Sequence, residues 1–480
     1  MLPGGSVWNL LDFIPDELQA AAQGRGGWTY AGSALASATQ ILSLGYHPDA
    51  KKLIGLDQQS QMWDVLAATT IGSASVFHAP SGPPWFHRGK LIFPCAFDPS
   101  SPQVPFYYDG TTSGSLSSAP DGYFGCVYKD HSVLSNNPHL GTNENRVWFS
   151  AAGDPTTWDT SFGWWDTTGA VVALATLPNS LLILHNDSTE RLRGTTPPPG
   201  SDMVLEPFMP NVGCIDPFSL AYWQQNAIFA SSSGIYLTNG VSSVDLTAAA
   251  QMKTYWQSLM SGYVTTWRIA AGIYRDHYIV SVNNGSTLVD CLCFSLQNRT
   301  AWRFSNLHGS TFANVQVGQL EKCYMGQWNA GRVAELSSLW SPSASVKQDG
   351  DGANPSPIIE TGSFRGFDRL HRRWIESMGL QKWRYAYLDY DLRDAASDNP
   401  TISLSYATTP GGAYTSVVGG SIPETTDYGR ARRSIHNATV GAATRSNMME
   451  FKLAVNGPYS SAKLYTLEGT FDPIDIGRLK

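Results

Sequence analysis

Between about residues 40 and 340, the apolar positions fall into short runs separated by polar turns, and one unit recurs. The unit is an apolar strand, a turn, a second apolar strand, another turn and a third strand. Turns such as "SSSG" and "VNNGS" carry the Gly, Asn and Ser residues that hairpins use. Seven copies align, and their middle strands are centred on Ile54, Ile92, Val133, Leu182, Ile228, Ile279 and Cys323.

The spacing of these copies indicates a propeller. Successive centres are 38 to 51 residues apart, and four-stranded propeller blades recur at about 40–50 residues. The pattern therefore predicts an all-β chain with a β-propeller of about seven blades over residues 28–340. The segment "WTYAGSALAS" (28–37) is expected to pair into the last blade and close the ring. An ordinary large β-sandwich is the alternative.

The remaining segments complete the predicted domain organisation. Residues 1–27 are expected to form an N-terminal arm, and the polar Gly, Pro and Ser residues of 341–357 a linker. Residues 358–480 alternate in long strands such as "WRYAYLDYDLRD", which predicts a C-terminal antiparallel β-sandwich with a short tail. The stretch 246–260 has helical spacing of apolar residues and is expected to be an insertion packed on the propeller.

Composition agrees with a turn-rich β-protein, because 45 Gly and 28 Pro accompany only 15% charged residues in 480. The net charge of −7 argues against a protein that grips nucleic acid through many phosphates. The charge is −9 up to residue 355 and +2 over 356–480. Six scattered cysteines without CxxC pairs are expected to be reduced and mostly buried. No run of 18 apolar residues occurs, so neither a signal peptide nor membrane insertion is expected.

The stretch "RVWFSAAGDPTTWD" (146–159) raises the question of an enzyme, because it resembles the Asp-box hairpins of sialidase propellers. The box is broken, since Ser150 and Asp154 are four apart and Gly153 precedes the Asp. A sialidase also needs an arginine cluster, which has no recurring placement here. We therefore expect no catalytic residues. Paired carboxylates for glycoside cleavage could in principle come from Asp159, Asp166, Asp187, Glu190 or Asp216.

Other chemistry is equally sparse in the sequence. The ten histidines include no HxH or HExxH, and no phosphate-binding glycine loop occurs, so neither a metal nor a cofactor is predicted. Two segments are candidate interaction sites. One is the aromatic pair Trp164 and Trp165 in the loop-like "SFGWWDTTG"; the other is the basic "RGFDRLHRRW", with Arg365, Arg369, Arg372 and Arg373.

Several segments together resemble a tail protein of tailed double-stranded DNA phages. They are "NLLDFIPDELQAAAQGRGGWTYAGS" at the N-terminus, "ENRVWFSAAGDPTTWD", "NVGCIDPFSLAYWQQNAIFASSSGIYLTNG" and the C-terminal "RSNMMEFKLAVNGPYSSAKLYTLEG". The resemblance implies a tail-hub or nozzle subunit of the virion, assembled in the host cytoplasm. Such subunits form a ring, usually of six, below the portal and its adaptor.

The resemblance also implies a DNA path. The ring would form the exit channel, through which double-stranded DNA passes without specific binding, and an acidic propeller suits a wall that repels the strand. Basic and acidic surfaces on one subunit permit contacts that repeat around an axis. The alternatives are a tail-tip subunit that binds a carbohydrate host receptor, a baseplate, decoration or collar subunit, and the sialidase-like glycoside hydrolase.

Overall fold

The computed structural model describes residues 27–340, except residues 37, 39, 73–79, 96–103, 136–144, 286, 318–319 and 329. Outside that range it describes residue 349 and the strands given below. The chain divides into two compact units. The terminal unit is Met1–Thr29, Trp302–Asn306 and Ser337–Lys480, and the propeller unit is Tyr30–Ala301 and Leu307–Leu336.

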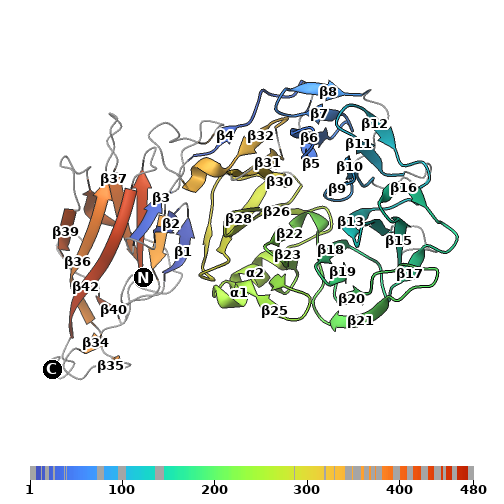
Figure 1. Cartoon of the computed structure of the whole chain (residues 1–480). Coiled ribbons are helices and arrows are strands. Elements are labelled where there is room, and N and C mark those ends of the chain that lie inside the picture. Colours follow the sequence, from blue (N-terminus) through green and yellow to red (C-terminus); the bar gives the residue numbers. More distant parts are fainter. Residues whose placement is uncertain are drawn as a thin grey trace. The chain divides into compact units, whose positions relative to one another are not determined.

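The propeller unit is a succession of small antiparallel sheets arranged in a ring (Figure 1). Blade 1 consists of β5 (Ile41–His47), β6 (Lys52–Asp57), β7 (Met62–Asp64) and β8 (Thr69–Ile71). Blade 2 consists of β9 (Trp85–His87), β10 (Lys90–Phe93), β11 (Phe106–Tyr108) and β12 (Ser113–Ser115). Blade 3 consists of β13 (Phe124–Tyr128), β14 (His131–Ser135), β15 (Arg146–Ala151), β16 (Asp154–Trp158) and β17 (Trp164–Asp166).

The later blades repeat this meander. Blade 4 consists of β18 (Ala173–Leu177), β19 (Ser180–Leu184), β20 (Thr189–Arg193) and β21 (Val204–Met209). Blade 5 consists of β22 (Ala221–Trp223), β23 (Asn226–Ser231), β24 (Gly234–Thr238) and β25 (Ser243–Asp245). Blade 6 contains β26 (Arg268–Tyr274), β27 (His277–Asn283) and β28 (Leu288–Ser295), followed by β29 (Ala301–Arg303). Blade 7 contains β30 (Gly309–Val317), β31 (Leu320–Gln327) and β32 (Val333–Glu335).

The predicted fold class is confirmed, and each predicted copy of the repeat corresponds to one blade. The seven predicted centres lie in the second strands of seven different sheets, and each of these side chains is fully buried. They are buried because blades pack face to face. Ile54 of blade 1 shares a core with Leu91 of blade 2, and Leu182 of blade 4 shares one with Phe229 of blade 5.

The ring is closed by the segment that follows residue 28, as predicted. Strand β4 (Thr29–Tyr30) is the outer strand of blade 7, beside β32. The Ala31 N–H then donates to the Val333 carbonyl (2.8 Å), and the Leu35 side chain is buried in the core between blades 7 and 1. The last blade is therefore completed by β4, the first strand of the propeller, which ties the two ends of the propeller together.

The predicted helical insertion is present but consists of two helices, α1 (Leu246–Ala249) and α2 (Lys253–Met260). They are separated at Gln251, whose φ of 59° is incompatible with a continuous right-handed helix. Leu246 and Trp256 are buried in the core between blades 5 and 6. A short 3₁₀-helix, η1 (Pro217–Ser219), precedes blade 5, and another, η2 (Ser337–Trp340), follows blade 7.

The terminal unit contains mainly antiparallel sheets, the arrangement predicted for the C-terminal domain. One has the order β1-β33-β41-β37-β38: β1 (Val7–Leu11), β33 (Ile358–Thr361), β41 (Glu450–Asn456), β37 (Thr401–Ala407) and β38 (Thr415–Ile422). Another has the order β2-β3-β42-β36-β39, with β40 beside β36: β2 (Phe13–Asp16), β3 (Ala21–Gly24), β42 (Ala462–Pro473), β36 (Gln381–Leu392), β39 (Ala431–His436) and β40 (Arg445–Ser446).

The N-terminal segment differs from the expected arm. Strands β1, β2 and β3 are members of the two sheets of the terminal unit, where β1 pairs with β33 and β3 pairs with β42. The propeller is therefore inserted in sequence between the first and later strands of the terminal unit. The expected linker 341–357 lies outside the described residues, apart from Asp349.

Candidate functional site

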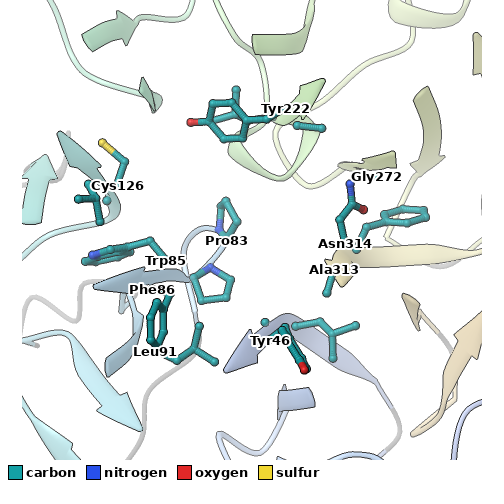
Figure 2. Close-up of a pocket in the computed structure, with 18 of the residues that line it drawn as sticks. Tyr46, Pro83, Trp85, Phe86, Leu91, Cys126, Tyr222, Gly272, Ala313 and Asn314 are labelled. Carbon is teal, nitrogen blue, oxygen red and sulfur yellow. The ribbon is translucent and has the colours of Figure 1, made fainter. Parts of the chain in front are cut away.

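The first strands of all seven blades surround one cavity of about 600 Å³ on the propeller axis. Each of β5, β9, β13, β18, β22, β26 and β30 contributes to its wall, as Figure 2 shows for Tyr46, Trp85, Tyr222 and Asn314. The cavity is therefore a product of the closed ring, since the strands that form it span the sequence from residue 44 to residue 314.

Glycines allow the first strands to approach so closely. A Cβ on Gly125 in β13 would lie 2.4 Å from the Trp85 indole of the preceding blade, and one on Gly272 in β26 would lie 2.7 Å from Phe312 of the next blade. Both distances are shorter than any ordinary carbon contact. Side chains at these two positions would force the blades apart, so the glycines set how closely neighbouring blades approach each other around the cavity.

The cavity wall is uncharged. Among the described residues that line it there is no Lys, Arg, His, Asp or Glu. Burial raises the pKa of the Cys126 thiol to about 12, so the thiol is protonated and unreactive at neutral pH. Burial likewise raises the pKa of Tyr222, although 44% of this side chain is accessible. Tyr222 belongs to the wall of the cavity (Figure 2).

The wall also sets the size of what can enter. A cavity of about 600 Å³ lies in the range of small-molecule sites, about 300–1,000 Å³. That volume holds a small molecule rather than a length of duplex DNA.

The hairpin "RVWFSAAGDPTTWD" is built from β15 and β16, and its acid has a structural role. The Asp154 carboxylate accepts hydrogen bonds from the Thr156 N–H (2.8 Å) and from the hydroxyls of Thr156 and Thr157. These hydrogen bonds lower the pKa of Asp154. Trp158 is buried in the core between blades 2 and 3. Asp109 in blade 2 holds Thr111 and Thr112 in the same way, so this is a recurring turn of the propeller.

The other carboxylates considered for glycoside cleavage also have hydrogen-bonding partners. Asp159 accepts from two backbone amides, Asp166 pairs with Arg146, and Asp187 accepts from Ser188. Glu190 pairs with His185, and Asp216 caps η1 and accepts from the Ile269 amide. No cluster of three or more potential metal ligands occurs within the described residues. No helix among those residues is long and apolar enough to cross a membrane.

One grouping that the sequence did not reveal has the composition of a catalytic triad. His87 contacts the Ser132 hydroxyl through Nδ1 (2.8 Å) and the Asp130 carboxylate through Nε2 (3.2 Å). Ser132 is fully buried, and its hydroxyl also accepts from the Trp85 indole. Burial lowers the pKa of His87. Since a substrate cannot reach Ser132, we assign this network to holding blade 2 against blade 3.

The predicted interaction residues Trp164 and Trp165 lie in strand β17, not in a loop. They pair with Trp148 and Val147 of β15, and each is half-buried against a different core of blade 3. Trp164 also lies under the Arg146 guanidinium (4.6 Å from the ring centroid). The accessible aromatic at this edge is Phe162, which stacks on Trp164 and is 66% exposed.

The basic segment lies largely outside the described residues. Arg365, Arg369 and Arg372 lie outside the described residues. Arg373 belongs to β35 (Arg373–Trp374), which pairs with β34 (Phe367–Asp368), but its side chain is outside the described part of the structure.

Among known proteins, the chain has matches in structure but none in sequence. No family model matches the chain, and no curated protein matches its sequence. Among solved structures, the chain is similar to the RRP9 WD40 repeats (TM-score 0.41, 10% identity, 64% of this chain and 98% of that one). It is also similar to the Neurospora crassa Pan2 WD40 domain (TM-score 0.39, 9% identity, 64% of this chain and 94% of that one). A third similar structure is Saccharomyces cerevisiae Sqt1 (TM-score 0.37, 10% identity, 65% of this chain and 98% of that one).

Proposed function

We propose that this chain is a structural virion protein of a tailed double-stranded DNA phage, a tail-hub or nozzle subunit that assembles with copies of itself into a closed ring. Its neighbours would be the portal, the adaptor and other tail proteins. The subunits would line or support the channel through which the genome leaves, and the protein would have no enzymatic activity.

The proposal that the protein is not an enzyme rests on one observation: its potentially reactive side chains have structural roles. Of the carboxylates named as glycosidase candidates, Asp159 and Asp216 hold turns, Asp166 and Glu190 pair with basic groups, and Ser132 is inaccessible. None of the described residues that line the axial cavity is charged, so none could hold a sialic acid carboxylate or act as general acid. The phage assignment itself rests on the sequence resemblance, and the acidic first 355 residues, which carry a net charge of −9 and include the propeller, suit a wall that DNA passes.

A test of the ring uses the basic segment of the terminal unit. We expect the triple variant Arg369→Glu, Arg372→Glu and Arg373→Glu to be lost from virions while the isolated subunit stays folded by circular dichroism. Reversing these charges converts attraction between neighbouring subunits into repulsion. Incorporation of the triple variant into virions at the wild-type level would show that this segment is not part of the interface.

A matched control changes the net charge by the same amount on the propeller. Lys51, Arg275 and Arg299 are exposed, and their replacement by Glu is expected to leave incorporation unchanged. Loss of both triple variants from virions would mean that total charge, not the basic segment, controls assembly.

One observation favours the second candidate function, binding of a carbohydrate receptor at the tail tip. The axial cavity presents aromatic rings and hydrogen-bonding groups without charge, which is the surface that a neutral sugar requires.

A further inference from the structure

We propose that the axial cavity of the propeller is a binding site for a neutral saccharide. The proposal deepens the second candidate function and is independent of ring assembly, because the cavity belongs to a single propeller. Its volume of about 600 Å³ leaves room for a short oligosaccharide, within the usual range of ligand sites.

The lining determines the charge of the ligand. A carboxylate, phosphate or ammonium group would lose its hydration in the cavity and find no opposite charge among the described lining residues. Two of the side chains there that could ionise, Tyr222 and Cys126, are held neutral, since burial raises the pKa of each. Nucleotides, sialic acids and charged peptides are therefore disfavoured.

The rings of the wall provide the apolar part of the recognition. Tyr46, Phe86 and Phe312 are each half-buried, and they contribute to the wall from blades 1, 2 and 7. The C–H face of a pyranose is apolar and stacks on such aromatic faces. A sugar would therefore cover ring surface that water otherwise covers.

Two polar groups distinguish a sugar from an apolar side chain. The Tyr222 hydroxyl accepts from the Thr176 N–H (3.0 Å) and keeps its own hydrogen as a donor. The Asn314 oxygen accepts from the Ile273 N–H (3.1 Å), which leaves the amide nitrogen as a donor. Both side chains are exposed to the cavity. An apolar occupant would bury these donors without partners, whereas sugar hydroxyls would accept from them.

The test measures binding of lactose, maltotriose and N,N′-diacetylchitobiose to the full chain by saturation-transfer NMR and calorimetry. We expect at least one of these sugars to bind. 3′-Sialyllactose, which adds a carboxylate to lactose, should bind more weakly than lactose or not at all. Tyr222→Phe and Asn314→Ala should each weaken binding about tenfold, the value of one hydrogen bond of the usual strength.

Phe162→Ala is the matched control, because it removes an exposed aromatic at the outer edge of blade 3. Hydrogen exchange on the wild-type chain locates the site without any variant, and slower exchange in β22 and β30 is expected with sugar. The proposal is overturned if none of the three neutral sugars binds at millimolar concentration. It is also overturned if sialyllactose binds as tightly as lactose, or if Phe162→Ala abolishes binding while the cavity variants retain it. None of these results would contradict the proposal that the subunits form a ring, which is tested separately.

Discussion

We expect Glu190→Ala to lower the free energy of unfolding by about 3–5 kcal/mol, the usual effect of breaking a buried ion pair. Glu190 and His185 are both buried, with His185 Nε2 3.0 Å from Glu190 Oε2. The other ring nitrogen lies 3.0 Å from the Ala170 carbonyl oxygen. Since a carbonyl and a carboxylate can only accept, both ring nitrogens must donate, so the imidazole is protonated. Removing Glu190 would leave that charge buried and unpaired.

The pH dependence of this effect follows from the direction of the two shifts. Burial alone would lower the pKa of His185, but its bonds to Glu190 and Ala170 outweigh burial and raise it above 6.5. Burial opposes the shift of Glu190 too, yet His185 and Thr168 lower its pKa below 4.5. The His185 contribution to stability is full below 6.5 and is lost as pH rises through its folded-state pKa. The Glu190 contribution is full above 4.5 and is lost as pH falls.

Urea denaturation across pH measures this directly. The difference in free energy of unfolding between the wild type and Glu190→Ala should be greatest between about pH 4.5 and 6.5. It should become smaller below and above this range. Asp166→Ala is the control, because the Asp166 side chain, which pairs with Arg146, is 63% exposed. This ion pair should contribute less than about 1 kcal/mol to the free energy of unfolding. Equal effects of the two variants, or a difference that does not change with pH, would contradict the assignment of a buried charged pair.

We expect Leu35→Asp to destabilise the whole propeller by roughly 4 kcal/mol or more, because it buries a charge without a partner. Leu35 is 3% exposed in the core between blades 7 and 1, where it packs with Ile41, Val315 and Val333. Its own N–H donates to the Gly331 carbonyl. The substitution therefore acts at the closure of the ring, and loss of that closure exposes the edges of two blades.

Thermal unfolding followed by circular dichroism and limited proteolysis tests this prediction. Ser33→Asp introduces the same charge at an exposed position of the same segment and should leave the melting temperature nearly unchanged. If Leu35→Asp melts like the wild type, or loses only the segment before residue 40, then closure is not what stabilises the ring.

The sequence predicted the blades because their second strands are buried on both faces. Ile183 and Leu184, for example, belong to strand β19, in which four apolar residues follow one another and every residue is buried. The outer strands were harder to recognise, since a strand such as β12 (Ser113–Ser115) is short and polar. Strand β3 (Ala21–Gly24) has neither β-branched residues nor alternation, and only its pairing with β42 makes it part of a sheet. For this reason the sequence predicts an arm at the N-terminus.

The axial cavity and the His87 network could not be predicted, because tertiary structure assembles them. Trp85 and Gly125 meet across two blades, and Tyr222 and Asn314 come from blades 5 and 7. No local spacing marks such residues. The glycines in the middle of apolar first strands, Gly45, Gly125 and Gly272, are the available signal, since glycine within a strand often marks close approach of another chain segment.

The most direct test of the proposed function is negative-stain electron microscopy of the purified full-length chain. The account predicts closed rings of one symmetry order with an axial hole wide enough for duplex DNA, formed by several propellers around it. Open filaments, or particles the size of a single subunit at every concentration at which virions assemble, would contradict it.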